Sequence, residues 1–442
     1  MQNVLYLELA NSVSDKGFSL DELVFRTRQL FEREGMAGVI ELILSLLDEK
    51  LALDLYLKRG PWRPSPCCDH PRYDSHGRRE KRIRTSCGEV KLSWRRSRCR
   101  NCGAVVVPLR EFLGLAPYQS KTGELERMVK EVVSEQSYRR SSSVLGTVGS
   151  VPVPKSTAHR WVADTDCDEL RWPRGLRYLL GDGSGYKRRP QASAELNNRG
   201  EVRVALGVDR LGRTVALGAW SGRSWEEIGA ELNQNRGRRA KAELLVSDGE
   251  HGLAEGLSRL ANGYQRCHWH MVRDLNYTLW EDKAPKAERE EKGRELAGLL
   301  GVEVPADSVE PVKDADRQEV SDRIAESERR LDELASAFIA KGYVKAAGYV
   351  RRAKENLFSH LRLWLKWGLV GPRTANLIER MMREIGRRLK RIAYGWSEGG
   401  AEKMARIIIK RFSTAQQWEA YWMKKLRIDG NVIMVYRGVR AK

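Results

Sequence analysis

Two aspartates in this chain each follow a short apolar stretch and precede a glycine. Asp182 comes directly after the stretch LRYLLG, and Asp248 comes after ELLVS. Carboxylates that face one another from neighbouring strands can share two divalent ions, the arrangement used for in-line phosphoryl displacement. Mg²⁺ binds few carboxylates and keeps several waters, which suits two aspartates and one further acid. An Asp-Gly pair is also a common turn, so each aspartate alone has a purely structural interpretation. The pair in this order favours metal-dependent catalysis.

Cysteines form a second group of candidate ligands. Cys67-x-x-His70 and Cys99-x-x-Cys102 have the spacing of zinc knuckles, and together they supply the four ligands of a tetrahedral zinc site. Cys68 competes with Cys67 for the first position. The basic, strand-like stretches between the pairs, 79–85 and 89–94, are too small to build a core, so zinc would stabilise them. The alternative is a ribbon held by packing alone.

The bulk composition points to a nucleic acid partner. The 442 residues carry 79 Lys and Arg against 59 Asp and Glu, a formal charge of +20, which favours contact with phosphate backbones. A mean hydropathy of −0.54 and the lack of a long apolar run argue against a membrane protein. The N-terminus has no secretion signal pattern, and most of the seven cysteines are clustered. We therefore expect a protein of the reducing cytoplasm.

The segment that carries the two aspartates has alternating strands and helices. Strands are predicted over 176–180, 201–208, 214–220, 242–246 and 264–270. A helix is expected to begin at the capping box Ser224 to Glu227, and a second helix covers 252–260. This order, three strands followed by helix, strand, helix and strand, is that of a ribonuclease-H-like fold. In that fold the strands that end near Asp182 and Asp248 are neighbours.

The N-terminal part reads as helical and DNA-binding modules. Residues 20–58 have helical periodicity without a basic bias, which favours a packing or oligomerisation role, and 60–64 is a linker by composition. Helices are predicted between 120 and 164, one capped by Ser137 and the last, 157–163, capped by Ser156. They fit a helix-turn-helix whose last helix enters the major groove, or else a helical spacer. The residues expected on DNA here are Lys155, Thr157, His159 and Arg160, with Arg82 and Arg84 in the ribbon.

Three short motifs further on carry a family resemblance. VSDGEHGL, then RCHWH, then RTANLIERMMREIGRR resemble the bacterial insertion-sequence transposases of the Mutator-like superfamily. In that family the second catalytic aspartate is followed by Cys-x-x-His, and the third acid lies in a Thr-x-Asn-x-x-Glu helix. The matching residues here are Asp248, then Cys267 and His270, then Thr374, Asn376 and Glu379. The resemblance spans roughly 67–412 and implies a DDE transposase, in which Asp182, Asp248 and Glu379 bind Mg²⁺ or Mn²⁺.

The third acid has a rival. Ile378, Met382 and Ile385 form the buried stripe of one predicted helix, with Glu379 at its edge and able to point toward the sheet. Arg383 and Arg387 lie on the remaining faces, where they would bind DNA phosphates. Glu398 is the alternative acid, although a first-turn Glu after a Ser cap is also explained by the helix dipole. The Thr374 and Asn376 context favours Glu379.

The motif Cys267-x-x-His270 has too few ligands for a structural zinc site. A packing or orienting role beside the active site is therefore the better interpretation, shared with Thr374 and Asn376. The long charged stretch 281–366 is helical by pattern. The resemblance implies an all-helical insertion that covers the active site and contacts transposon-end DNA, and a helical spacer is the alternative. Trp280, Trp364 and Trp367 are candidates to stack on an unpaired base, although apolar spacing favours a core position for the last two.

The expected fold class is a multidomain α/β protein. Its ribonuclease-H-like core is interrupted by an all-α insertion and preceded by helical, zinc-ribbon-like and helix-turn-helix modules. The predicted boundaries are 1–60 helical, 61–110 zinc-ribbon-like, 111–168 helix-turn-helix, 169–279 core, 280–370 insertion, and 371–442 the last part of the core with the tail.

The expected function is Mg-dependent cleavage at transposon ends followed by strand transfer into target DNA. The partners would be the terminal inverted repeats, the target DNA and a second copy in the synaptic complex, in the bacterial cytoplasm and at the nucleoid. One alternative is a non-catalytic DNA-binding regulator derived from such an element. Another is a different ribonuclease-H-like nuclease, such as a resolvase, which the long helical stretch argues against.

Overall fold

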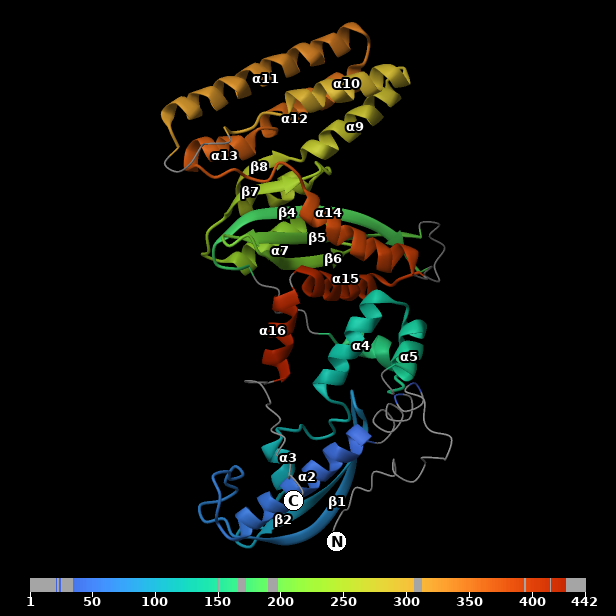
Figure 1. Ribbon diagram of the computed structural model, residues 1–442, viewed down its shortest axis with the longest axis vertical. Helices are drawn as coiled ribbons and strands as arrows, with labels where there is room; N and C mark the ends of the chain where they lie inside the picture. The colour runs from blue at the N-terminus through green and yellow to red at the C-terminus, as the bar shows by residue number, and fades with distance from the viewer. Residues whose placement is uncertain are drawn as a thin grey trace. The chain divides into compact units, whose positions relative to one another are not determined.

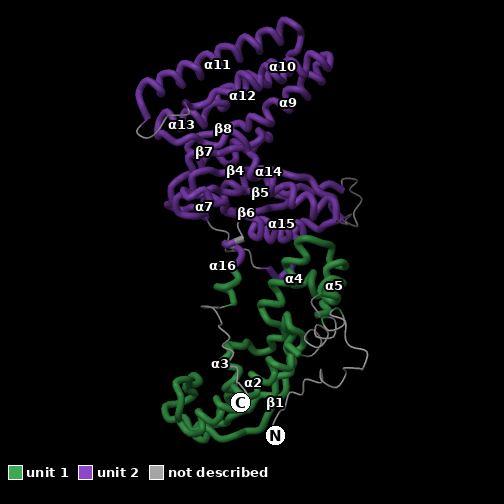
Figure 2. Tube along the Cα trace, viewed as in Figure 1, with its two compact units in different colours: residues 1–161, 422–442 green, residues 162–421 purple. Residues whose placement is uncertain are grey.

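The computed structural model describes residues 21, 24, 35–148, 151–165, 172–189, 198–305, 312–392, 395–413 and 415–426. The predicted helical region at 20–34 lies almost wholly outside them. The chain divides into two compact units, residues 1–161 with 422–442, and residues 162–421 (Figure 2). The predicted mixed α/β class is confirmed by a five-stranded mixed sheet and many helices (Figure 1). None of the helices in these ranges is long and apolar enough to cross a membrane.

A long antiparallel hairpin dominates the first unit. Strand β1 (Tyr73–Thr85) pairs with β2 (Gly88–Cys99), and the short β3 (Val105–Val106) adds to the far edge of β2. Val90, Leu92 and Trp94 alternate with polar residues along β2, so their side chains gather on one face. Helix α2 (Met36–Tyr56) and the short α3 (Pro108–Phe112) pack on that face and give the hairpin its core.

Three helices follow the hairpin. The Thr122 hydroxyl caps α4 (Gly123–Glu135), and the Ser137 hydroxyl caps α5 (Tyr138–Thr147), as predicted for Ser137. Helix α6 (Lys155–Ala163) begins earlier than expected, so Ser156 lies inside it rather than capping it. The His159 ring lies 5.2 Å from the Tyr138 ring, which ties α6 to α5.

The second unit is built on a sheet of order β6-β5-β4-β7-β8. Its strands are β4 (Leu176–Lys187), β5 (Arg199–Asp209), β6 (Thr214–Ser221), β7 (Ala242–Ser247) and β8 (Ala261–Arg266). Strand β5 pairs antiparallel with both β4 and β6, whereas β4 pairs parallel with β7 and β7 pairs parallel with β8. All five predicted strands are present, but the end predicted for the last one was wrong. Strand β8 stops at Arg266, and His268–His270 form the first turn of α9 (His268–Glu281).

Helices cover both faces of this sheet. Helices α7 (Trp225–Arg236) and α8 (Leu253–Leu257) pack with Leu179 and Leu245 on one face, and the predicted capping box of Ser224 and Glu227 opens α7. Helix α14 (Asn376–Gly386) packs on β4, and helix α15 (Glu398–Ser413) packs on β6 (Figure 1). Because successive side chains of a strand point to opposite faces, β4 presents groups to both sides.

Between β8 and α14 the chain forms a helical region with its own apolar core. After α9 come α10 (Lys286–Leu299), α11 (Asp314–Ala340), α12 (Val344–Ala353) and α13 (Ser359–Trp367). Leu275, Leu331 and Phe358 are among the residues buried in this core. Trp364 is buried there as well, whereas Trp280 and Trp367 are exposed. A short π-helix, Arg387–Arg391, follows α14, and α16 (Ala415–Leu426) is the last described helix.

Candidate active site

The two aspartates come together through the parallel pairing of β4 and β7. Leu180 pairs with Val246, and two residues further along each segment lie Asp182, inside β4, and Asp248, the first residue after β7. The first strand does not end at the Gly-Asp-Gly sequence as expected, because β4 runs on to Lys187. Asp182 is therefore a mid-strand residue, and a turn does not account for it. The flanking Gly181 lies on the opposite face, where a Cβ would come within 3.2 Å of Leu253 in α8. Glycine there lets α8 pack closely on β4.

Glu379 joins the two aspartates from the first turn of α14. Burial, followed by the charges of Asp248, Glu250 and Glu379, raises the pKa of Asp182 to about 7. The Oε1 atom of Glu379 is buried and has no hydrogen-bond donor among the described residues. The acids around Asp182 therefore disfavour its charged form, in addition to the effect of burial. Such a site suits a divalent cation, and carboxylate oxygens are the ligands that Mg²⁺ prefers.

The rival acid Glu398 lies elsewhere. It is the first residue of α15, and its Oε1 accepts a hydrogen bond from Arg188 Nη1 at 3.0 Å. Glu379, and not Glu398, is among the charges that raise the pKa of Asp182 most strongly. Asp182 is thus influenced by the charges of Asp248 and Glu379, whereas Glu398 pairs with a cation.

The Cys-x-x-His motif connects the helix of the third acid to the sheet. The Cys267 Sγ atom accepts a hydrogen bond from the backbone N–H of Ala375, the N-cap residue of α14, at 3.3 Å. His270 Nδ1 lies 3.5 Å from Glu379 Oε1. The ligand atoms of Cys267, His270 and Glu379 lie within 4.8 Å of one another, so these three groups could also bind a metal ion together. The contacts with the start of α14 and with the Glu379 carboxylate fit an orienting role as well. Of the other two motif residues, Thr374 is half-buried and Asn376 is exposed.

Arg266, whose guanidinium lies against the turn after Asp248, was not singled out from the sequence. Asp248 Oδ1 accepts the backbone N–H of Glu250 at 2.8 Å, and Gly249 has a φ of +83°. The Arg266 guanidinium lies against Gly249, where a Cβ would be only 0.5 Å from Arg266 Nη1. Arg266 also donates to the Tyr349 hydroxyl of α12 at 3.1 Å. The signal in the sequence for this turn was Gly249 itself, because a positive φ favours glycine.

We expect Gly249→Ala to be more damaging than Gly252→Ala. Both glycines have a φ near +80°, at +83° and +80°, but a Cβ at Gly252 has no heavy atom within 4 Å. The two variants therefore share the backbone strain and differ in the clash with Arg266. Gly249→Ala should lower the free energy of unfolding by about 1 kcal/mol or more beyond Gly252→Ala. Urea unfolding checks this, and equal losses would show that Arg266 does not need the space.

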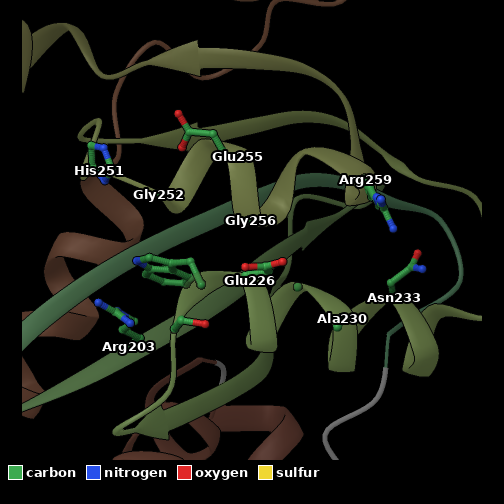
Figure 3. Close-up of a pocket in the computed structure, with 12 residues that line it drawn as sticks. Arg203, Glu226, Ala230, Asn233, His251, Gly252, Glu255, Gly256 and Arg259 are labelled. Atoms are coloured by element: carbon green, nitrogen blue, oxygen red, sulfur yellow. The ribbon is translucent and has the colours of Figure 1, made fainter.

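A second residue that the sequence analysis missed is the acid Glu250. Its Oε1 accepts a hydrogen bond from Trp225 Nε1 at 2.8 Å and lies 3.6 Å from Arg203 Nε. Burial raises the pKa of Glu250. Arg203 and Trp225 also line a cavity of about 630 Å³ whose other side is formed by α8, with His251 and Glu255 pointing along its rim (Figure 3). A fourth carboxylate thus lies beside the candidate site and is held in place by a cation and an indole.

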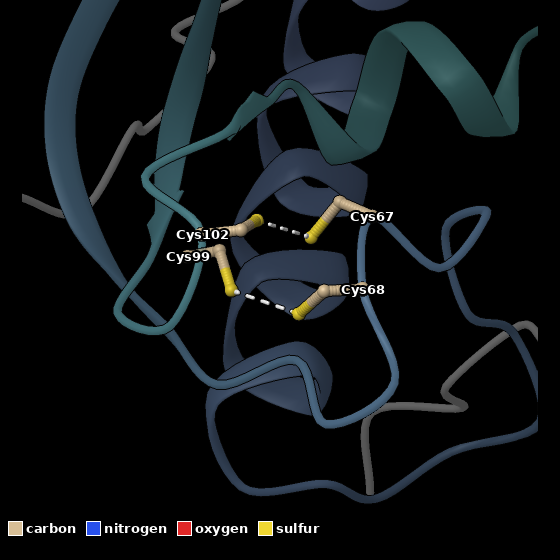
Figure 4. Close-up of side chains that lie close together, drawn as sticks. All are labelled: Cys67, Cys68, Cys99 and Cys102. Carbon is tan, nitrogen blue, oxygen red and sulfur yellow. Dashed lines mark hydrogen bonds between the residues drawn. The ribbon is translucent and has the colours of Figure 1, made fainter.

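The candidate zinc ligands in the first unit differ from the predicted set. Cys67, Cys68, Cys99 and Cys102 have Sγ atoms within 4.8 Å of one another (Figure 4). The Cys68–Cys99 and Cys67–Cys102 Sγ distances are 3.8 and 3.5 Å. With Zn–S bonds of about 2.3 Å, two sulfurs of a tetrahedral site lie roughly 3.8 Å apart, so the four thiols could bind zinc. His70 is exposed and is not a member of this group, and Cys68 takes the place predicted for it.

Backbone geometry prepares one of these thiols for a metal. Hydrogen bonds from the backbone N–H groups of Cys102, Arg72 and Asn101 lower the pKa of Cys99 to about 6. They stabilise the thiolate, the form that binds metal. The knuckle Cys99-x-x-Cys102 folds in this way because Gly103 adopts a φ of +76° at its end.

The residues predicted to contact DNA lie mostly on the surface. Arg82 and Arg84 are exposed on β1, and Lys155, His159 and Arg160 are exposed on α6, whereas Thr157 is half-buried. Arg383 is exposed on α14. Arg387 is half-buried and pairs with Glu384 at 3.0 Å. Arg84, Lys155, Arg160 and Arg383 are available to phosphates. Arg82 pairs with Glu89 at 3.3 Å, and Arg387 is engaged with Glu384.

The chain matches no family model, and no curated protein compared with it is similar to it. Any assignment of function therefore depends on the geometry of the site and on the motifs in the sequence.

Proposed function

We propose that this protein is a DNA transposase of the DDE type, with Asp182, Asp248 and Glu379 as its catalytic acids. The observation that carries the proposal is that burial on β4, together with the charges of Asp248 after β7 and Glu379 on α14, raises the pKa of Asp182. The strand order, with three antiparallel strands and two parallel ones, supports a ribonuclease-H-like core. The sequence resemblance to Mutator-like insertion-sequence transposases supports the reaction class.

The proposed reaction has two displacements at phosphorus in one site. In the first, a water oxygen bonds to phosphorus, the bond to the 3′ oxygen breaks, and a 3′-OH is released. In the second, the oxygen of that hydroxyl bonds to the phosphorus of a target phosphodiester, the bond from that phosphorus to the target's 3′ oxygen breaks, and a target 3′-OH is released. Mg²⁺ or Mn²⁺ bound to the three acids would activate the attacking oxygen and stabilise the leaving one. The Cys267 contact with Ala375 and the His270 contact with Glu379 would hold the third acid toward β4.

The first unit would bind the transposon ends. The exposed arginines of β1 and the exposed polar face of α6 supply contacts for phosphates and for a major groove. The four-cysteine cluster would hold a structural zinc ion that ties the start of β1 to the end of β2.

The zinc proposal predicts which ligand matters. We expect Cys68→Ser to lose most of the bound zinc and His70→Ala to keep it, because Cys68 Sγ is in the cluster and His70 is not. The measurement is the zinc content of each purified protein by elemental analysis, with wild type expected at about one ion per chain. The reverse ranking of the two variants would restore His70 as the ligand.

The test of the proposed function is end cleavage by the purified full-length protein. Labelled DNA with the ends of its own element is incubated with Mg²⁺ or Mn²⁺, and with EDTA as the control. Metal-dependent nicking at the end that exposes a 3′-OH would support the proposal. Specific binding without cleavage in either metal would favour the alternative, a non-catalytic DNA-binding protein derived from a transposase.

A further inference from the structure

Helix α2 carries a second apolar face that the hairpin does not use. Its core face, which includes Leu51 and Leu55, is buried on β2. Six other apolar residues of this helix and its C-cap are 38–60 % exposed. They are Met36, Val39, Ile43, Leu46, Leu53 and Leu57, and together with Lys50 we name them the α2 seam.

The spacing of the seam is that of a coiled coil. Its members recur at alternating intervals of three and four residues, which are the a and d positions of a heptad. At about 100° per residue these positions form one stripe, directed roughly 140° away from the core face. A helix that buries one stripe in its own unit needs no second apolar stripe for folding. Exposed apolar residues in such regular register are typical of a surface that pairs with another helix.

The composition of the seam favours a second copy of the same chain. Ile43 at an a position with Leu46 and Leu53 at d positions is the pattern that favours two-stranded pairing. The same seam presented twice about a two-fold axis is self-complementary. Lys50 is the one charged residue of the seam, so the surface does not suit a nucleic acid.

The charges that flank the seam are compatible with this pairing. The Lys50 Nζ atom lies 3.2 Å from Asp54 Oδ2 of its own helix, which offsets its charge, and Glu49 is adjacent and exposed. In a parallel pair, Lys50 of one copy would lie beside the partner's Glu49. A single Lys at an a position specifies the register of a two-stranded coiled coil.

We propose that the α2 seam is a homodimerisation surface of this protein. The inference depends only on the first unit and is independent of the proposed catalysis. Its location would let two chains associate without using the acids, the cysteine cluster or the exposed face of α6. A homodimer is also what a synaptic complex of two transposon ends would need.

Sedimentation velocity of the full chain at micromolar concentrations tests the proposal. Wild type is expected to be a dimer. Ile43→Glu and Leu46→Glu should each weaken the dimer about 100-fold, because a carboxylate would be buried without a partner. The control Ser45→Glu lies on the same helix at an exposed position outside the seam and should leave the dimer intact. A monomeric wild type, or seam variants that remain dimeric, would overturn the proposal.

Cross-linking provides a second measurement that needs no disruptive change. Residue 46 lies at the centre of the seam and would face its copy in either helix direction. Leu46→Cys should therefore form a covalent dimer under mild oxidation, while Ser45→Cys and wild type, with the same native cysteines, should not. If residue 46 is protected from thiol labelling in a monomer, another part of the chain covers the seam and the proposal fails.

Discussion

Replacing any one of the three converging acids by its amide is expected to lower the rate of DNA end cleavage roughly 1,000-fold or more. Asp182→Asn, Asp248→Asn and Glu379→Gln keep the shape of each side chain and remove a metal-binding charge. Loss of several kcal/mol of transition-state stabilisation corresponds to a rate effect of that size. Binding to the same DNA should change little, because the proposed DNA-binding residues of β1 and α6 are untouched.

Glu398→Gln is the matched control for this series. Glu398 is an acid at the start of a neighbouring helix, but it pairs with Arg188 rather than with the aspartates. Cleavage and binding would be measured with one labelled end fragment and wild-type protein alongside. Cleavage should persist in Glu398→Gln. If Glu379→Gln still cuts and Glu398→Gln does not, the third acid has been assigned to the wrong helix.

Removing the charge of Asp182 is expected to stabilise the metal-free protein. The pKa of this carboxyl is raised from 3.8 to about 7, so the folded protein holds a proton that the unfolded chain has already lost above pH 4. The unfolded chain binds fewer protons between about pH 4 and pH 7, so the free energy of unfolding falls as pH rises through this window. The loss of stability is complete above about pH 7. A pKa shift of about three units corresponds to at most roughly 4 kcal/mol of the free energy of unfolding.

Asp182→Asn should therefore be more stable than wild type at pH 8, and the difference should be smaller at pH 5 and close only below about pH 4. Urea unfolding in EDTA at the two pH values measures the difference. Mg²⁺ at pH 8 should recover stability in wild type and not in the variant, because the cation offsets the repulsion that the amide removes. An equal gap at both pH values would mean that the pKa of Asp182 is not raised in the folded chain.

Local patterns in the sequence were enough to predict the strands and several helix starts. Apolar patterns located all five strands of the second unit, although the last was predicted over 264–270 and is observed over Ala261–Arg266. Ser137 and the Ser224–Glu227 capping box begin helices as predicted. These features depend on residues close together in the chain, whose hydrogen bonds and side-chain spacing are read directly. The ends of strands were less predictable. Strand β4 continues past Asp182 because pairing with β5 extends to Lys187.

Contacts between distant segments decided the composition of the sites. Cys68 joins the cluster in place of His70, because the fold of the loop before β1, and not the Cys-x-x-His spacing, sets which side chain points inward. Arg266 could not be selected from sequence, since only the folded sheet brings it beside Gly249. Glu250 is close to Asp248 in the chain, but its burial and its contacts with Trp225 and Arg203 depend on the fold.

The choice between Glu379 and Glu398 shows the same division. The sequence by itself determined that two helices near the C-terminus each carry a candidate acid in the first turn. The tertiary structure decided which one faces β4, because α14 packs on that strand and α15 packs on β6. Helical periodicity gives the buried stripe of a helix, but the strand against which the stripe packs depends on contacts far apart in the chain.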